Sequence, residues 1–247
     1  MRWWVYLLIF IVSQLSGGLI IVLLQSWLDL GYQVSIVSAL LLTNVLTIVA
    51  TMQLRPVRLS RAADWRWFST LAVVMAPPAI LLVNIVQELL PELPSFVDDE
   101  SLSQLIRHPL GIATLAVVGP VAEELMFRAG VLGDFLRRHK SGWQSILLSA
   151  FLFALAHLNP IQMPAAFILG LLLGWTYWRT GSLWAPIAIH VMNNSLAVAI
   201  GLIYDNPDTT LTDVLGPVVT CFVVVFSAMW LGACAYQAKS HSEQVEA

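Results

Sequence analysis

Charged residues are scarce in this sequence: they make up 11% of the chain, whereas soluble domains contain about 25%. Hydrophobic residues make up 58%, and the mean hydropathy is +0.80. So little charge cannot cover a water-exposed surface, and the 12 lysines and arginines form no patch suited to nucleic acid. The composition excludes a soluble globular protein and predicts an all-α polytopic membrane protein.

Cysteine is also rare, with 2 residues in the whole chain. Cys221 and Cys234 both fall in the last apolar run, where the helical residues between them span about 20 Å. Disulfide-bonded Cα atoms lie within about 7 Å of each other, so a bond between these two is excluded and we interpret both as buried packing residues. No lipidation signal is present, and the apolar run after Arg2 continues past any cleavage site, which indicates an uncleaved first span.

Eight apolar stretches have about the length needed to cross a bilayer as a helix. They cover residues 3–28, 33–52, 68–90, 109–136, 142–158, 161–178, 183–204 and 214–236. The fifth and sixth are short and are joined by Leu158-Asn159-Pro160, so a tight hairpin or a partly re-entrant pair is the alternative to two full crossings. We expect a single membrane domain over 1–247, an outer loop at 91–107 and a disordered polar tail at 238–247.

Lysine and arginine lie almost entirely on one side of these spans. Of the 12, Arg107 lies in an outer gap and Arg128 within the fourth span. The others precede the first span or follow an even-numbered one: Arg2, Arg55, Arg58, Arg61, Arg66, Arg137, Arg138, Lys140, Arg179 and Lys239. Loops rich in lysine and arginine stay in the cytoplasm, so we expect eight spans with both termini cytoplasmic.

Three charged residues interrupt the fourth span. Glu123, Glu124 and Arg128 lie in the apolar run 109–136, where each charge costs roughly 3 kcal/mol even on the lenient insertion scale. Glu124 and Arg128 are four residues apart on a helix, so they share a face and can neutralise each other. Glu123 lies about 100° around the helix and is left unpaired. This free carboxylate is the first candidate functional group.

Polar residues also stand inside the fifth and seventh spans. Phe153 and His157 share one helix face, and His190 and Asn194 share another. Together with Glu123 they supply a carboxylate, two imidazoles and an amide from three helices, and such groups must face the bundle interior or water. Gly170 and Gly174 in the sixth span form a small-xxx-small pattern, which is typical of helix packing.

These groups are the ones needed to hydrolyse an amide. A carboxylate can take a proton from water, and a neighbouring imidazole can orient that water and protonate the leaving amine. A second imidazole and an amide can donate hydrogen bonds to the oxyanion. Alternatively, Glu123, His157 and His190 with an open fourth position form a catalytic zinc set, so Zn²⁺ is a candidate cofactor. The zincin pattern of two histidines flanking a glutamate is absent, and the residues leave both versions open.

The three motifs Glu123-Glu124-x-x-x-Arg128, Phe153-x-x-x-His157 and His190-x-x-x-Asn194 occur in this order within predicted spans. In this they resemble the CPBP family of intramembrane proteases, which includes the type II CAAX prenyl endopeptidases. The resemblance covers the motif-bearing helices at about 109–204. It implies an endopeptidase acting on a membrane-associated or lipidated peptide or protein.

The family's first glutamate and catalytic histidine match Glu123 and His157, and its oxyanion-binding pair matches His190 and Asn194. Its second glutamate and its arginine match Glu124 and Arg128, with Phe153 in support. The compact chain is similar to the bacterial branch, which implies a bacterial cytoplasmic membrane with its lipids as surroundings.

Several alternatives stay open at this point. Glu123 could be a structural carboxylate, and His157 an interfacial histidine near the outer end of its span. By residue count His157 lies about 25 Å from the cytoplasmic boundary and His190 about 15 Å, so they can meet only if the fifth span tilts or starts deeper. Buried glutamate and histidine also build proton relays, which makes an ion-coupled transporter one rival. A non-catalytic bacteriocin-immunity-type membrane protein is the other.

Overall fold

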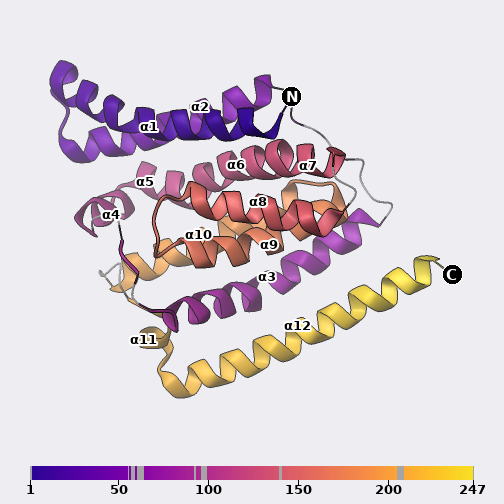
Figure 1. The fold of residues 1–247 in the computed structure, drawn as a ribbon. Coiled ribbons are helices and arrows are strands. Elements are labelled where there is room, and N and C mark those ends of the chain that lie inside the picture. Colours follow the sequence, from indigo (N-terminus) through magenta and orange to yellow (C-terminus); the bar gives the residue numbers. More distant parts are fainter. Residues whose placement is uncertain are drawn as a thin grey trace.

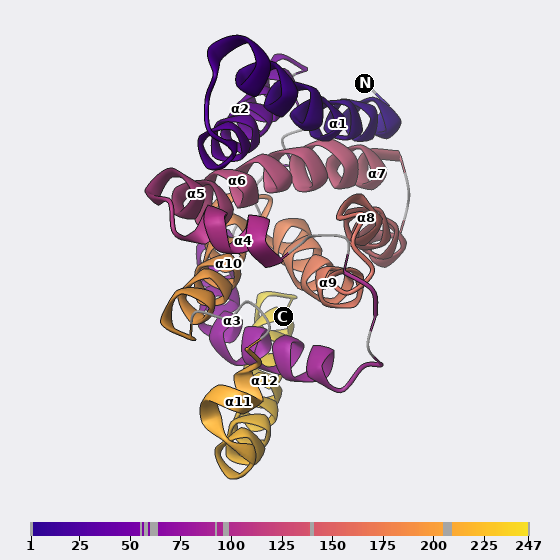
Figure 2. The same cartoon turned by 90° about the vertical axis from the view of Figure 1, so that its left-hand side faces the viewer.

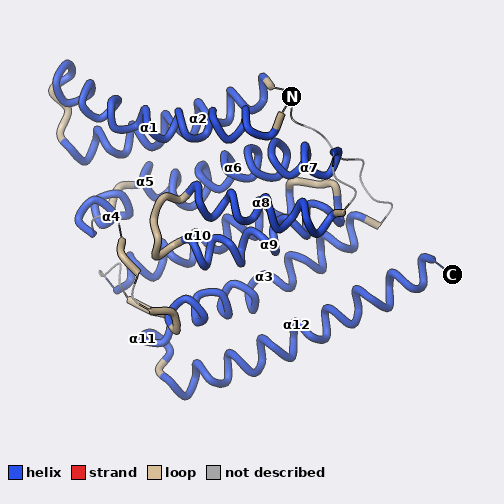
Figure 3. The backbone as a smooth tube through the Cα atoms, viewed as in Figure 1, coloured by secondary structure: helices blue, strands red, loops and turns tan. Residues whose placement is uncertain are grey.

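The computed structural model describes residues 2–54, 56, 59, 64–91, 93–95, 99–138, 141–204 and 209–246. These residues form helices and turns, with no strand among them, so the predicted all-α fold is confirmed. Figure 3 shows the helices following one another along the chain through short loops. Arg55, Arg58, Arg61 and Lys140, which carried part of the charge argument, lie outside the described residues.

The helix bounds follow the predicted apolar stretches closely. The α-helices are α1 Trp3–Leu28, α2 Tyr32–Gln53, α3 Trp65–Glu88, α4 Asp99–Ile106, α5 Pro109–Ala113, α6 Gly119–Glu124, α7 Gly133–Arg138, α8 Gly142–Ala156, α9 Met163–Thr180, α10 Trp184–Tyr204, α11 Leu211–Leu215 and α12 Pro217–Glu246. Two π-helical stretches, η1 Thr114–Val118 and η2 Leu125–Leu132, join α5, α6 and α7. The segment 109–138 is therefore one rod, which we call the motif helix.

Six helical segments are long and apolar enough to cross a membrane: α1, α2, α3, the motif helix, α10 and the first part of α12. The protein is therefore a polytopic membrane protein. The shorter α8, with 15 residues, is also apolar. α8 and α9 pack closely, since a Cβ on Gly170 would lie 3.1 Å from Cβ of Ala150. Gly170 thus lies in a helix contact, and the full count of eight crossings stays a prediction.

The helices run roughly side by side in layers (Figure 1). The α1–α2 hairpin lies at one edge, followed by the motif helix, then α8, α9 and α10, then α3, with α12 at the opposite edge (Figures 1 and 2). Both chain ends lie at the same end of the bundle (Figure 1). An even number of membrane crossings gives this arrangement. That both termini lie on the cytoplasmic side stays a prediction.

Aromatic packing joins α1, the motif helix and α8. Phe127 contacts Phe10 at 5.3 Å and Phe153 at 5.2 Å between ring centroids, both edge to face. A buried carboxylate, Asp134, accepts a hydrogen bond from the backbone N–H of Trp3 at 2.9 Å. That amide opens α1 and would otherwise lack a partner. The first helix is thereby fixed to the motif helix at both its apolar face and its start.

The structure of the C-terminal helix contradicts two predictions, one about the tail and one about Cys221. The tail expected to be disordered from residue 238 is helical to Glu246, because α12 continues past its apolar part. There His241 stacks on Trp67 at 4.1 Å and lies 3.4 Å from a carboxylate oxygen of Asp64, which holds the end of α12 against α3. Residue 247 lies outside the described part. Cys234 is buried as expected, but Cys221 is exposed on the helix surface.

Candidate active site

The motif helix changes register immediately before the two glutamates. The N–H of Gly119 bonds to the carbonyl of Thr114, five residues back, and residue 120 is a proline without an N–H. The carbonyl of Leu115 therefore has no backbone donor. Asn194 on α10 supplies one, with its Nδ2 3.0 Å from that oxygen. The predicted functional amide is thus held against the motif helix by a backbone defect.

A second π-helical stretch, η2, follows the glutamates directly. Ser149 on α8 donates a hydrogen bond to the carbonyl of Phe127 within this stretch, at 3.4 Å. Such π-bulges cost stability and occur frequently at functional sites. The sequence analysis missed both stretches. The adjacent Gly119-Pro120 was the available signal, because it removes a backbone donor inside a membrane span.

Glu124 lies at the centre of the site and is fully buried. Its Oε2 is 3.0 Å from Nε of Arg128, which is the ion pair expected from the four-residue spacing. The two atoms are close but not aligned for a hydrogen bond. Oε1 is 2.8 Å from Nδ1 of His190, a partner that the sequence did not predict. The guanidinium of Arg128 lies 4.4 Å over the ring of Phe153. Glu124 therefore orients both a cation and an imidazole.

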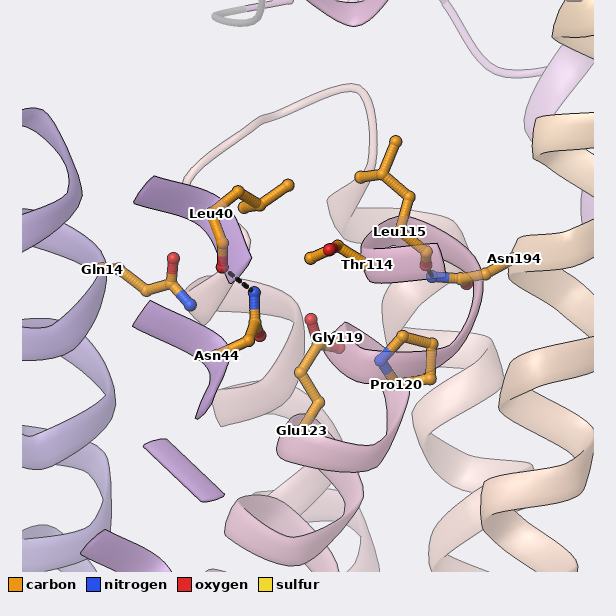
Figure 4. A pocket seen from close by; sticks show the side chains of 9 residues that line it. All are labelled: Gln14, Leu40, Asn44, Thr114, Leu115, Gly119, Pro120, Glu123 and Asn194. Carbon is orange, nitrogen blue, oxygen red and sulfur yellow. Dashed lines mark hydrogen bonds between the residues drawn. The ribbon is translucent and has the colours of Figure 1, made fainter. Parts of the chain in front are cut away.

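Glu123 lies on the other side of the same imidazole. Its Oε2 is 3.7 Å from Nε2 of His190 and has no hydrogen-bond partner within the described part of the chain. The side chain is 21% exposed and projects into a pocket of about 120 Å³ (Figure 4). The lining comprises Gln14, Leu40, Asn44, Thr114, Leu115, Gly119, Pro120, Glu123 and Asn194. Glu123 and Asn194 thus meet at one pocket, and the buried His190 lies next to Glu123 outside the pocket lining.

His157 stands apart from this group. It is half-buried at the end of α8, and its Nδ1 is 2.9 Å from the carbonyl oxygen of Phe153. The Phe153 ring contacts His157 edge to face at 4.8 Å and His190 at 5.8 Å. Both imidazoles therefore contact the same Phe153 ring, despite the depth difference expected from residue counts. Among the described ion pairs, the partner of Glu123 is His190 and not His157.

The residues do not fit the alternative zinc set as they stand. Across the described residues, no three His, Cys, Asp or Glu side chains are close enough to hold a metal ion. Each of the two histidines contacts the Phe153 ring, and both nitrogens of His190 face carboxylates. We therefore derive no step through a metal.

Fold and site together define a class: a helical membrane protein with a buried carboxylate, imidazole and guanidinium cluster beside a polar pocket. Residues 106–196 match the family described as Rce1-like type II CAAX prenyl endopeptidases. This matched segment contains all three motifs, so the resemblance drawn from the motifs is confirmed for it. The description of this family is that of an endopeptidase.

Individual relatives agree with this family. The chain is 30% identical to the membrane-embedded CAAX protease MroQ of Staphylococcus aureus over 105 residues, which are 40% of this chain and 42% of MroQ. It is 29% identical to YdiL of Bacillus subtilis, described as a candidate membrane peptidase, over 94 residues and 38% of each chain. An uncharacterised 24.3 kDa protein of Escherichia coli is 28% identical over 107 residues, 42% of this chain and 48% of that one. Each alignment spans less than half of the relative, and no solved structure matches the chain.

Proposed function

We propose that the protein is an intramembrane endopeptidase that cleaves a peptide bond of a membrane-associated or lipidated substrate with activated water. One observation carries this proposal. The carboxylate of Glu123 projects into a pocket between membrane-spanning helices, with an unbonded oxygen 3.7 Å from His190. A pocket of about 120 Å³ has room for several waters. Ionisable groups within membrane spans are costly and rare, and those that occur usually mark a functional site.

Glu123 acts as the general base in this proposal. It takes a proton from a pocket water, whose oxygen attacks the carbonyl carbon of the substrate. His157 assists by protonating the leaving amine. Its Nδ1–H donates to the Phe153 carbonyl, so Nε2 first accepts the proton that Glu123 took from the water and then delivers it to the leaving amine. His157 packs against the Phe153 ring and does not line the pocket, so the step needs a small rotation of the Phe153 ring or of His157.

Asn194 and His190 stabilise the oxyanion of the tetrahedral intermediate. The amide nitrogen of Asn194 carries two hydrogens, and Leu115 takes one of them, so one donor remains on the pocket side. His190 is held through Nδ1 by Glu124, so a protonated Nε2 can donate as well. Fixed donors of this kind stabilise charge that develops during the reaction. The Glu124–Arg128 pair fixes the position of both glutamates on the motif helix.

The names of the relatives suggest the surroundings of this reaction. MroQ is named as a membrane-embedded CAAX protease of a bacterium. We therefore propose the bacterial cytoplasmic membrane as the location, with both termini cytoplasmic. Membrane lipids surround the protein, and a peptide or protein is the substrate.

The test is the isosteric variant Glu123→Gln. Membranes of cells with the wild type or the variant are compared by N-terminal proteomics, and the purified proteins by metal analysis. Loss of a general base lowers the rate by roughly 10²-fold or more, so new N termini should disappear in Glu123→Gln. Glu100→Gln, outside the pocket on α4, serves as the control and should keep them. Unchanged cleavage in Glu123→Gln would refute the proposal, and a rate that follows bound metal would replace the direct mechanism.

A further inference from the structure

The pocket has a second polar wall that lies outside the family match. Gln14 on α1 and Asn44 on α2 line it opposite Glu123 (Figure 4). Both belong to the α1–α2 hairpin, whereas the matched segment begins at residue 106. Asn44 belongs to none of the three motifs. The tertiary structure instead places this carboxamide beside the candidate base.

Neither carboxamide is needed to hold the hairpin together. A buried hydrogen bond of 2.7 Å between the hydroxyls of Ser13 and Thr47 already links α1 to α2 at this level. Asn44 donates from Nδ2 to the carbonyl of Leu40 in its own helix, at 2.8 Å. For Gln14 no hydrogen-bond partner exists among residues that the structure describes. Polar groups at this depth are costly when they lack a partner.

The free atoms of the two side chains point to one kind of ligand. Asn44 keeps its Oδ1 as an acceptor, 3.9 Å from where a Cβ would stand on Gly119. Gln14 keeps one acceptor and two donors. Carboxamides can bind a peptide backbone, because their carbonyl oxygen accepts from a backbone N–H and their NH₂ donates to a backbone carbonyl. The pocket wall itself is uncharged apart from Glu123, which fits a neutral ligand.

We propose that Gln14 and Asn44 bind the backbone of the substrate on either side of the scissile bond and hold it in front of Glu123. This inference rests on the proposed function and deepens it: the substrate is bound as an extended peptide backbone. A pocket of about 120 Å³ is smaller than the 300–1,000 Å³ typical of sites for drug-sized ligands. It therefore takes a peptide unit with its water, and a lipid chain on the substrate stays in the bilayer.

The variants Gln14→Met and Asn44→Leu remove the carboxamides at nearly constant size. Their matched controls are Gln25→Met, farther along α1, and Asn84→Leu on α3. Asn84 makes the same bond to its own helix as Asn44, at 2.8 Å to the carbonyl of residue 80, but does not line the pocket. The probe is a synthetic peptide spanning the bond whose cleavage depends on Glu123 in the proteomic comparison. Purified protein in detergent is assayed with it.

Each pocket variant should raise KM by about 2- to 10-fold with little change in kcat, because a hydrogen bond made equally in ground and transition states is lost. A second probe replaces one backbone N–H beside the scissile bond by an ester oxygen. The ester lacks the N–H that a side-chain carbonyl of the pocket accepts, so it should raise KM for the wild type and for both controls. In the pocket variant that has lost this accepting carbonyl, the ester should raise KM no further.

Two outcomes overturn this inference alone: KM values in Gln14→Met and Asn44→Leu that match their controls, or an ester penalty that persists in both. The proposed function itself is refuted if Glu123→Gln still cleaves the peptide, or if the proteomic comparison finds no cleavage that depends on Glu123. A binding measurement distinguishes failure of this inference from failure of the proposed function. The Kd of the uncleaved peptide is measured for Glu123→Gln and for Glu123→Gln combined with Gln14→Met or Asn44→Leu. Each added substitution should raise that Kd by the same factor by which it raises KM.

Discussion

Replacing Arg128 by methionine should lower the free energy of unfolding by about 3–5 kcal/mol, since it leaves the carboxylate of Glu124 as a buried charge without its cation. The side chains are 1% and 0% exposed, so water cannot take over the role of the guanidinium. The remaining contact of Glu124, at 2.8 Å to His190, is charge-compensating only if the imidazole is protonated. Methionine keeps most of the packing against Phe153, which limits the loss of apolar contact.

The double variant Glu124→Gln with Arg128→Met tests whether the loss of stability comes from the unpaired charge of Glu124. It removes both charges together, and glutamine still offers an oxygen to Nδ1 of His190. Replacing a whole buried pair by neutral groups is often close to neutral for stability. We therefore expect the double variant to recover most of the loss. Its activity should stay low if the ion pair positions Glu123, which separates stability from positioning.

Denaturant titration in detergent micelles, followed by circular dichroism, measures the stability of all these variants. Arg66→Met, on the exposed start of α3, is the matched control and should change stability by less than about 0.5 kcal/mol. The reasoning is refuted if Arg128→Met costs less than about 1 kcal/mol, or if the double variant is no more stable than the single one.

Three further predictions use the same preparations. Asn194→Leu leaves the Leu115 carbonyl without a donor inside the membrane and should cost about 1–3 kcal/mol in the same titration. Gly170→Val should cost about 1–3 kcal/mol, because its Cβ would press on the backbone of α8 at 3.2 Å; an unchanged midpoint would show that α8 and α9 can separate. Hydrogen bonds from the hydroxyl and the backbone N–H of Thr210 hold the pKa of Asp213 below its ordinary value. The cap of α11 is therefore fully present above the ordinary pKa and is lost as pH falls through the lowered one. Amide protection in α11, expressed relative to the intrinsic exchange rate at each pH, should fall at acid pH in the wild type, and Asp213→Asn should remove this dependence.

The sequence by itself determined the class of fold and the identity of the motif. Long apolar runs require helices in a bilayer, because backbone polar groups must be satisfied within the segment. The four-residue spacing of Glu124 and Arg128 predicted a contact that the structure places at 3.0 Å. These inferences succeed because each depends on periodicity along a single helix, which the order of residues fixes.

Contacts between helices were decided by the tertiary structure. The rotation and depth of α8 and α10 against the motif helix place His190 between both glutamates. They also bring His157 and His190 against the same Phe153 ring. The polar wall with Gln14 likewise depends on how the α1–α2 hairpin docks. Apolar helix faces can pack at several rotations with similar burial, so a single sequence leaves these choices open. Packing across the whole bundle selects one of them, and with it the groups that meet at Glu123.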